Sequence, residues 1–175
     1  MLQVTQLIGF GTNSHPMSDK WRILMDGKPF PGGHLYHVPE VEMADVAGGA
    51  NLCSTIGGTP SANSYWYNDN PDLDYPPEDA FDGNISLKMW QSAYVTSSNP
   101  SPHWLGFTFN KPVAIVEVRL LWAAWPGPVP AAATYVHLDV GTSTSIQYEQ
   151  NGVWRTVKTF TSLATDTSHT LGIQI

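Results

Sequence analysis

The chain has 175 residues, of which 8 are basic and 15 acidic, giving a formal charge of −7 at pH 7. This length fits one domain with a single core, and an acidic chain without a basic cluster argues against a nucleic-acid partner. No apolar stretch approaches the ~20 residues of a membrane-spanning helix, and the first ten residues lack the features of a signal peptide. The single cysteine, Cys53, excludes an internal disulfide.

Short runs of β-branched and aromatic residues bounded by turn residues recur along the chain, and no segment has helical periodicity. In chain order these runs lie at 21–25, 41–46, 104–109, 113–122, 144–150, 153–160 and 169–175. Asn151-Gly152 predicts a two-residue hairpin turn with positive φ angles between two of them. Seven or more strands without helices predict an all-β fold of two packed sheets.

Long connections separate several of these runs, at 57–79, 93–103 and 123–135. Connections longer than about 12 residues are commonly functional, and each of these places aromatic residues beside polar ones. An aromatic ring can stack on the apolar face of a sugar while polar side chains bind its hydroxyl groups. The candidates for this role are Tyr65, Trp66, Tyr67, His103 and Trp125. The same loop aromatics could instead pack on the sandwich or contact another protein chain.

The stretch AFDGN at 80–84 combines a turn signal with oxygen ligands. Gly83 adopts positive φ without steric cost, and Asp82 and Asn84 can bond to nearby backbone groups, so a plain tight turn explains the stretch. A turn rich in carboxylate, carbonyl and amide oxygens also suits a hard cation such as calcium. The residues alone leave both interpretations open.

Several motifs, in their order and spacing, resemble the discoidin or coagulation-factor type C family, which includes family 32 carbohydrate-binding modules. They are AFDGN followed by Trp90 and Ser92, PHWLGFTFNKPVAIVEVRL at 102–120, and SIQYEQNGVWRTV at 145–157. The resemblance covers roughly residues 58–175. It implies an eight-stranded jelly-roll sandwich that binds glycans or lipid headgroups through loops at one end, without catalysis.

Two further motifs come in a different order from that of the usual member. KWRILM at 20–25 and VPEVEMADV at 38–46 are similar to the closing strands of the family, yet they precede the AFDGN turn. This order resembles circularly permuted versions of the domain in tailed-phage structural proteins; an unrelated N-terminal extension is the alternative. We expect residues 1–20 to form an arm or first strand and residues 21–175 to form one domain.

In the family the turn similar to AFDGN wraps a calcium ion. Carried over to this sequence, the resemblance implies as ligands the Asp82 side chain, carbonyls around Ala80 and Asn84, Ser86 and, from the permuted strand, Glu40. The segment departs from the family pattern, because the spacing from Asp82 to Trp90 is one residue longer and Leu87 or Lys88 stands where a threonine is expected. An empty turn, or one bridged by Lys88, is the alternative.

The remaining tryptophan and histidine residues are expected to have structural roles, not to form a metal or catalytic site. Trp90 and Trp104 occupy motif positions of buried aromatics, and Trp21 and Trp154 lie in strands, so all four are expected in the core. His34 and His37 have a spacing compatible with a metal pair but lack a third firm ligand. No motif of nucleophilic catalysis or phosphate binding is present, so no enzymatic activity is expected.

Two functions follow from the resemblance. The first is a non-catalytic binding domain of a virion, in a phage tail or capsid, or of an extracellular protein, which recognises cell-surface carbohydrate through its end loops. The second is a purely structural virion protein, a capsid decoration or a tail or baseplate component, whose loops contact other protein chains. The expected partners are therefore a cell-surface glycan or other virion proteins, with a homo-oligomer possible and without nucleic acid or membrane insertion.

Overall fold

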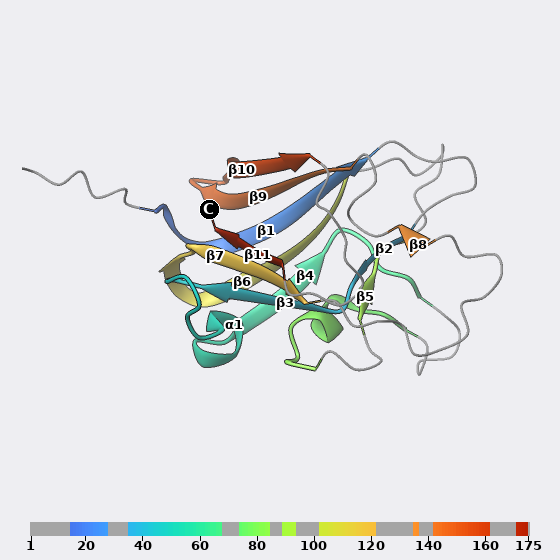
Figure 1. Ribbon diagram of the computed structural model, residues 1–175, viewed down its shortest axis with the longest axis horizontal. Coiled ribbons are helices and arrows are strands. Elements are labelled where there is room, and N and C mark those ends of the chain that lie inside the picture. Colours follow the sequence, from blue (N-terminus) through green and yellow to red (C-terminus); the bar gives the residue numbers. More distant parts are fainter. Residues whose placement is uncertain are drawn as a thin grey trace, which may run out of the picture.

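The computed structural model describes residues 15–27, 35–67, 74–84, 89–93, 102–121, 135–136, 142–161 and 171–174. Its strands are β1 (Met17–Gly27), β2 (Leu35–Val38), β3 (Glu40–Ala44), β4 (Gly58–Ala62), β5 (Trp90–Gln91), β6 (His103–Ala114), β7 (Glu117–Leu121), β8 (Tyr135–Val136), β9 (Thr142–Gln150), β10 (Val153–Thr161) and β11 (Leu171–Gln174) (Figure 1). One helical turn, α1 (Leu52–Thr55), and one 3-10 turn, η2 (Pro77–Ala80), accompany them. In these ranges no helix has the length and apolar character of a membrane span.

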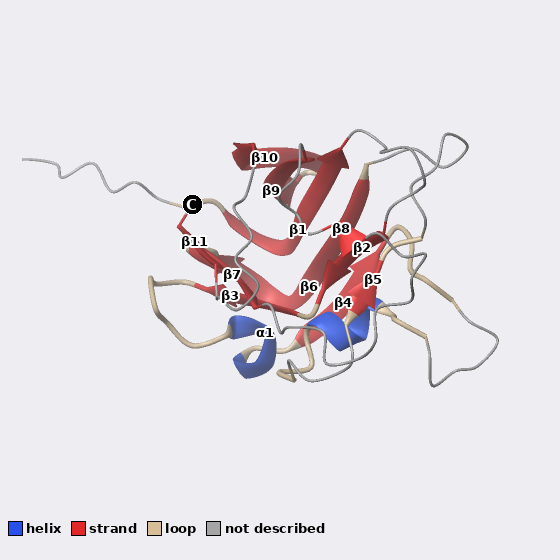
Figure 2. Ribbon diagram, turned by 45° about the vertical axis from the view of Figure 1, so that its right-hand side comes forward, coloured by secondary structure: helices blue, strands red, loops and turns tan. Residues whose placement is uncertain are grey.

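Two antiparallel sheets make up the body of the molecule (Figure 2). One has the strand order β10-β9-β1-β6-β4 and the other β11-β7-β3, which together give eight strands. A third, small sheet in the order β5-β2-β8 lies at one end. The predicted all-β sandwich is therefore confirmed, whereas the jelly-roll connectivity stays a prediction.

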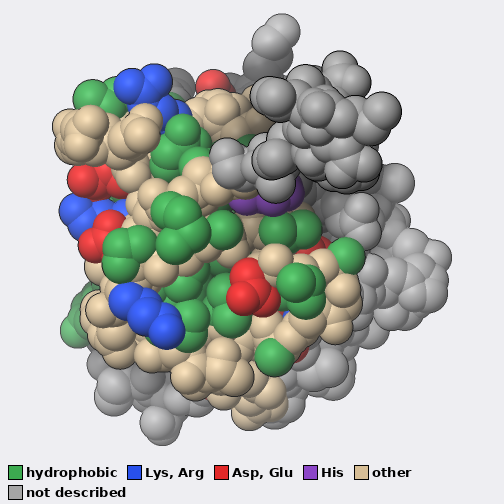
Figure 3. Space-filling model, turned by 90° about the vertical axis from the view of Figure 1, so that its left-hand side faces the viewer, with side chains coloured by type: hydrophobic (Ala, Val, Ile, Leu, Met, Phe, Trp, Pro, Cys, Tyr) green, Lys and Arg blue, Asp and Glu red, His purple; other side chains and the backbone are tan. Residues whose placement is uncertain are grey.

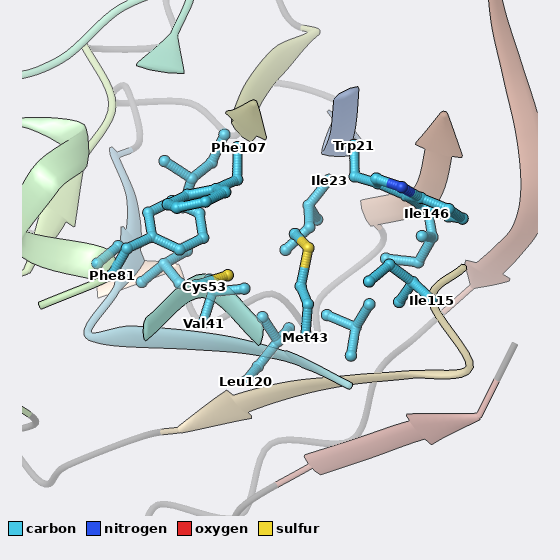
Figure 4. Packing of buried hydrophobic residues seen from close by; sticks show 14 of the residues in the cluster. Trp21, Ile23, Val41, Met43, Cys53, Phe81, Phe107, Ile115, Leu120 and Ile146 are labelled. Atoms are coloured by element: carbon cyan, nitrogen blue, oxygen red, sulfur yellow. The ribbon is translucent and has the colours of Figure 1, made fainter. Parts of the chain in front are cut away.

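The core is an apolar layer between the two larger sheets. Strand alternation sends every second side chain of β1 inward, and Met43 and Leu120 of the smaller sheet point toward Ile23 from the opposite side (Figure 4). Burying an apolar side chain of this size contributes about 1.5 to 3 kcal/mol. Outside the core, on the face drawn in Figure 3, the acidic and basic side chains of the described residues are interspersed among hydrophobic and polar ones.

Both segments on which the permuted order depends lie in the sandwich. β1 is in the centre of the five-stranded sheet, between β6 and β9, and β3 pairs along its length with β7. Both segments therefore lie in the same sandwich as β7, which contains much of the run at 113–122. β1 begins at Met17, so the end of segment 1–20 belongs to the first strand. The permuted order relative to the family stays a prediction.

Two predicted boundaries are wrong. The run at 113–122 is divided, because β6 ends in the five-stranded sheet and β7 begins in the other one; between them the N–H of Val116 donates to the Ala44 carbonyl at 2.8 Å. The loop predicted at 57–79 contains β4, an edge strand whose Pro60 is tolerated at that position. The predicted hairpin turn is confirmed, with Asn151 at φ 55° and Gly152 at φ 78°.

Candidate functional site

Glu40 begins β3 and is only 1% exposed. Its Oε2 accepts a hydrogen bond from the backbone N–H of Gly83 at 3.2 Å. Its Oε1 is buried and has no hydrogen-bond partner among the described residues. The fold therefore brings a carboxylate from β3 against the AFDGN turn, and no described residue bonds to one of its oxygens.

The AFDGN turn follows η2 directly. Gly83 has φ 77°, and the N–H of Asn84 donates to Oδ1 of Asp82 at 2.7 Å. Ala80 is fully buried, and the ring of Phe81 anchors the turn in the core. The turn and Glu40 thus meet as the resemblance implies, while Ser86 lies outside the described residues.

The surroundings of Glu40 and Asp82 are electrostatically unfavourable for two ionised carboxylates without a counter-ion. Burial raises the pKa of Glu40 to about 8; the N–H of Gly83 acts in the opposite direction, and the nearby Asp82 carboxylate raises this pKa further. A buried carboxylate is stable only when a proton, a donor or a cation neutralises it. Carboxylate and carbonyl oxygens are the ligands of calcium, so these residues fit a hard cation. In the described ranges no group of three or more His, Cys, Asp or Glu residues is assembled around a metal position.

A short segment at 64–67 lies at the same end of the sandwich. Trp66 forms a bridge with Tyr75, and its N–H donates to the Gln91 carbonyl at 2.8 Å. Gln91 belongs to β5, which pairs with Val38, two residues before Glu40. Backbone hydrogen bonds therefore fix segment 64–67 to the strands that lead to the turn.

The side chains of this segment alternate between solvent and protein, as expected for extended backbone. Tyr65 and Tyr67 are 44% and 65% exposed, whereas Trp66 is half-buried. Two of the candidates for sugar stacking, Tyr65 and Tyr67, are therefore presented at the surface on a fixed backbone. Trp125 lies outside the described residues.

His103 occupies a different position from that expected of a residue that binds sugar hydroxyl groups. It is 2% exposed, and its Nδ1 lies 2.7 Å from Oγ of Ser64. Its Nε2 is buried and has no hydrogen-bond partner in the part of the chain that the structure describes. Burial lowers the pKa of His103. The side chain supports segment 64–67 from beneath, so its burial does not favour direct contact with a ligand.

Two tryptophans predicted to pack in the core lie elsewhere. Trp21 and Trp90 are buried as expected, but Trp104 and Trp154 are only half-buried and contact Arg22. Since neighbours of Trp104 on β6 point into the core, strand alternation turns Trp104 to the outer face. Arg22 itself was not a predicted site residue, although its place next to the buried Trp21 signals an outward side chain.

No family model, curated protein or solved structure matches this chain. The resemblance to the discoidin family and the circular permutation therefore rest on the sequence motifs, and both stay predictions.

Proposed function

We propose that this chain is a non-catalytic binding domain that recognises cell-surface carbohydrate at the end of the sandwich formed by β2, β5 and segment 64–67. The observation that carries the proposal is the exposed pair Tyr65 and Tyr67 on a backbone held by hydrogen bonds. A tyrosine ring offers an apolar face for a sugar and a hydroxyl for its polar groups. Because the backbone is fixed before binding, little ordering is needed when the ligand arrives.

The proposal includes a calcium ion at the AFDGN turn. Glu40, Asp82 and backbone carbonyls around Ala80 and Asn84 would hold it. A divalent cation there would neutralise the two carboxylates and fix the turn against β3. The buried Oε1 of Glu40, which no described residue hydrogen-bonds, supports this assignment. As the resemblance implies, we place the domain on a virion or outside the cell.

The test is a glycan array probed with the full chain, with and without calcium, followed by titration of the bound glycan. Tyr65→Ala and Tyr67→Ala should each weaken binding by about 1 kcal/mol while leaving the melting temperature nearly unchanged, since exposed rings contribute little to the core. Val153→Ala is the matched control, because Val153 is also exposed but belongs to β10, which is not one of the strands at the proposed binding end. An empty array, or binding that both tyrosine variants retain in full, contradicts the proposal and favours a structural role with protein contacts.

A further inference from the structure

A second aromatic surface lies on the outer face of the five-stranded sheet, and Arg22 is at its centre. The guanidinium carbon of Arg22 is 4.1 Å from the ring centroid of Trp154 and 5.7 Å from that of Trp104. The three side chains come from β1, β10 and β6, which share this sheet. We call these three residues the Trp-Arg-Trp row.

The row is held in place by its neighbours. Nε of Arg22 donates to Oε1 of Gln147 at 2.8 Å, and Nε2 of Gln147 donates to Oγ1 of Thr156 at 3.0 Å. On β6, Gly106 pairs with Arg22 and has no side chain. The Trp104 ring lies 3.4 Å from the position that a Cβ of Gly106 would take, and so covers the glycine. Arg22 is thus oriented before any ligand binds.

Arg22 is a cation without a carboxylate partner among the described residues, unlike two other cations of the molecule. Lys20, on the same strand, pairs with Glu149 at 2.8 Å, and Arg119 pairs with two glutamates. Burial lowers the pKa of Arg22, which means that the cation is partly desolvated without compensation by an acid. Gln147 engages Nε, and no hydrogen bond to Nη1 or Nη2 is present within the described residues. These two groups have the fork geometry that matches a carboxylate.

We propose that the Trp-Arg-Trp row binds a saccharide that carries a carboxylate. The acid group pairs with Nη1 and Nη2 of Arg22, and an apolar sugar face stacks on Trp104 or Trp154. Charge complementarity at Arg22 itself favours this ligand, since none of the ion pairs among the described residues includes Arg22.

The surroundings of the row favour a saccharide over an acidic peptide. The nearby groups on this face include the hydroxyls of Ser145 and Thr159, whose oxygens lie 2.9 Å apart, and that of Thr156, a residue exposed at the surface. Hydroxyl groups both donate and accept, as sugar hydroxyls require. A peptide with several acids would bring further carboxylates toward Glu149 and against the overall negative charge of the chain.

This inference shares with the proposed function the assignment of a saccharide ligand, but it uses another surface, so the two can fail separately. The test measures binding of two matched pairs of probes to the full chain by calorimetry: the methyl glycoside of galacturonate, which has one carboxylate, against its methyl ester, and sialyllactose against lactose. At least one acidic probe should bind, and its neutral counterpart should bind at least about tenfold more weakly.

Variants of Arg22 identify the surface. Arg22→Gln should weaken binding of the acidic probe at least about tenfold, and Arg22→Lys should restore it only in part, because lysine keeps the charge without the fork. Lys20→Gln is the matched control, since it removes one positive charge from the same strand; it should change binding by less than about threefold. Trp154→Leu should also weaken binding and provides a second test if Arg22→Gln does not fold.

Three results would overturn the inference: neither acidic probe binds at millimolar concentration, Arg22→Gln binds as well as wild type, or a glutamate-rich peptide binds more tightly than the acidic saccharides. Binding of neutral glycans that depends on Tyr65 and Tyr67 would then still support the proposed function. Conversely, binding that depends only on Arg22 would support this inference and contradict the proposed function.

Discussion

Replacing Glu40 by glutamine tests the electrostatics at the AFDGN turn. Glutamine has nearly the same shape and can accept the hydrogen bond from Gly83, but it cannot ionise. In the folded chain burial raises the pKa of Glu40 from 4.5 to about 8, whereas the unfolded chain ionises near the ordinary value. Between these pH values the folded chain keeps a proton that the unfolded chain has released. The resulting stability is full below pH 4.5 and is lost as the pH rises through about 8.

The size of this effect follows from the two pKa values of Glu40. Each pKa unit corresponds to about 1.36 kcal/mol, so the change from 4.5 to about 8 amounts to about 5 kcal/mol of unfolding free energy. For a chain of this length that equals roughly 10 to 20 °C in melting temperature. Glu40→Gln cannot ionise and so does not lose this stability as the pH rises. In the absence of divalent cations, its unfolding free energy at pH 8 should exceed that of wild type by as much as about 5 kcal/mol.

The assay is urea unfolding followed by tryptophan fluorescence, from pH 4.5 to 8.5 in the presence of a calcium chelator. Glu42→Gln is the matched control, because it removes the next carboxylate of β3, which pairs with Arg119 at 2.6 Å. The control should keep the wild-type dependence of stability on pH between 6.5 and 8.5. Identical pH dependence in wild type and Glu40→Gln would refute the conclusion that Glu40 is buried in its protonated form.

Calcium adds a second comparison at pH 8. At a hundredfold excess over its dissociation constant it should stabilise wild type by ~2.7 kcal/mol and leave Glu40→Gln nearly unchanged. Asp82→Asn should also lose this gain, and the two substitutions should not add, since both act through one ion. If calcium does not raise the urea midpoint of wild type, the turn does not bind the cation. The predicted titration of Glu40 would not be affected by that result.

Three other substitutions test the scaffold by urea unfolding. Burial lowers the pKa of His103 below 6.5, so the unfolded chain takes up a proton before the folded chain does as the pH falls. The contribution of neutral His103 to stability is therefore full above pH 6.5 and is lost below it. His103→Gln should remove this pH dependence between pH 6.5 and 5. Gly58→Ala would press a Cβ against the Thr108 carbonyl and should cost about 1 to 3 kcal/mol; an unchanged midpoint would mean that β4 is not packed as described. Arg119→Met removes the ion-pair partner of Glu117 and should cost about 2 to 3 kcal/mol, whereas a loss near zero would show a solvated pair.

Local signals predicted local structure well. Asn151-Gly152 specified its turn because two consecutive positive φ angles suit few other residue pairs. The meeting of Glu40 with the turn at Gly83 is not a local property. No sequence periodicity relates Glu40 to the AFDGN turn. Their contact was suggested only by the order of motifs in the discoidin family, which the sequence resembles.

The outer face of the five-stranded sheet was missed for a different reason. Trp104 was expected in the core because of its motif position, although Leu105, Phe107 and Phe109 alternate with Gly106 and Thr108 in the same run. The contact of Trp154 with Arg22 depends on which strands pair, and β1 and β10 are joined through β9. A single sequence does not encode that order in its pattern. The outward position of Arg22 was predictable, but its neighbours were not.

The central place of β1 has a consequence for how the chain folds. β1 is the first described strand in the sequence, yet both strands that pair with its edges come much later in the chain. One edge pairs with β6 and the other with β9, where Tyr148 pairs with Trp21. During synthesis from the N-terminus, β1 therefore leaves the ribosome long before either partner exists. Sheets closed by such distant pairings form slowly and leave strand edges exposed meanwhile. We expect nascent chains that stop before β9 to aggregate or to depend on chaperones, and the β9–β10 hairpin to be the part whose arrival completes folding.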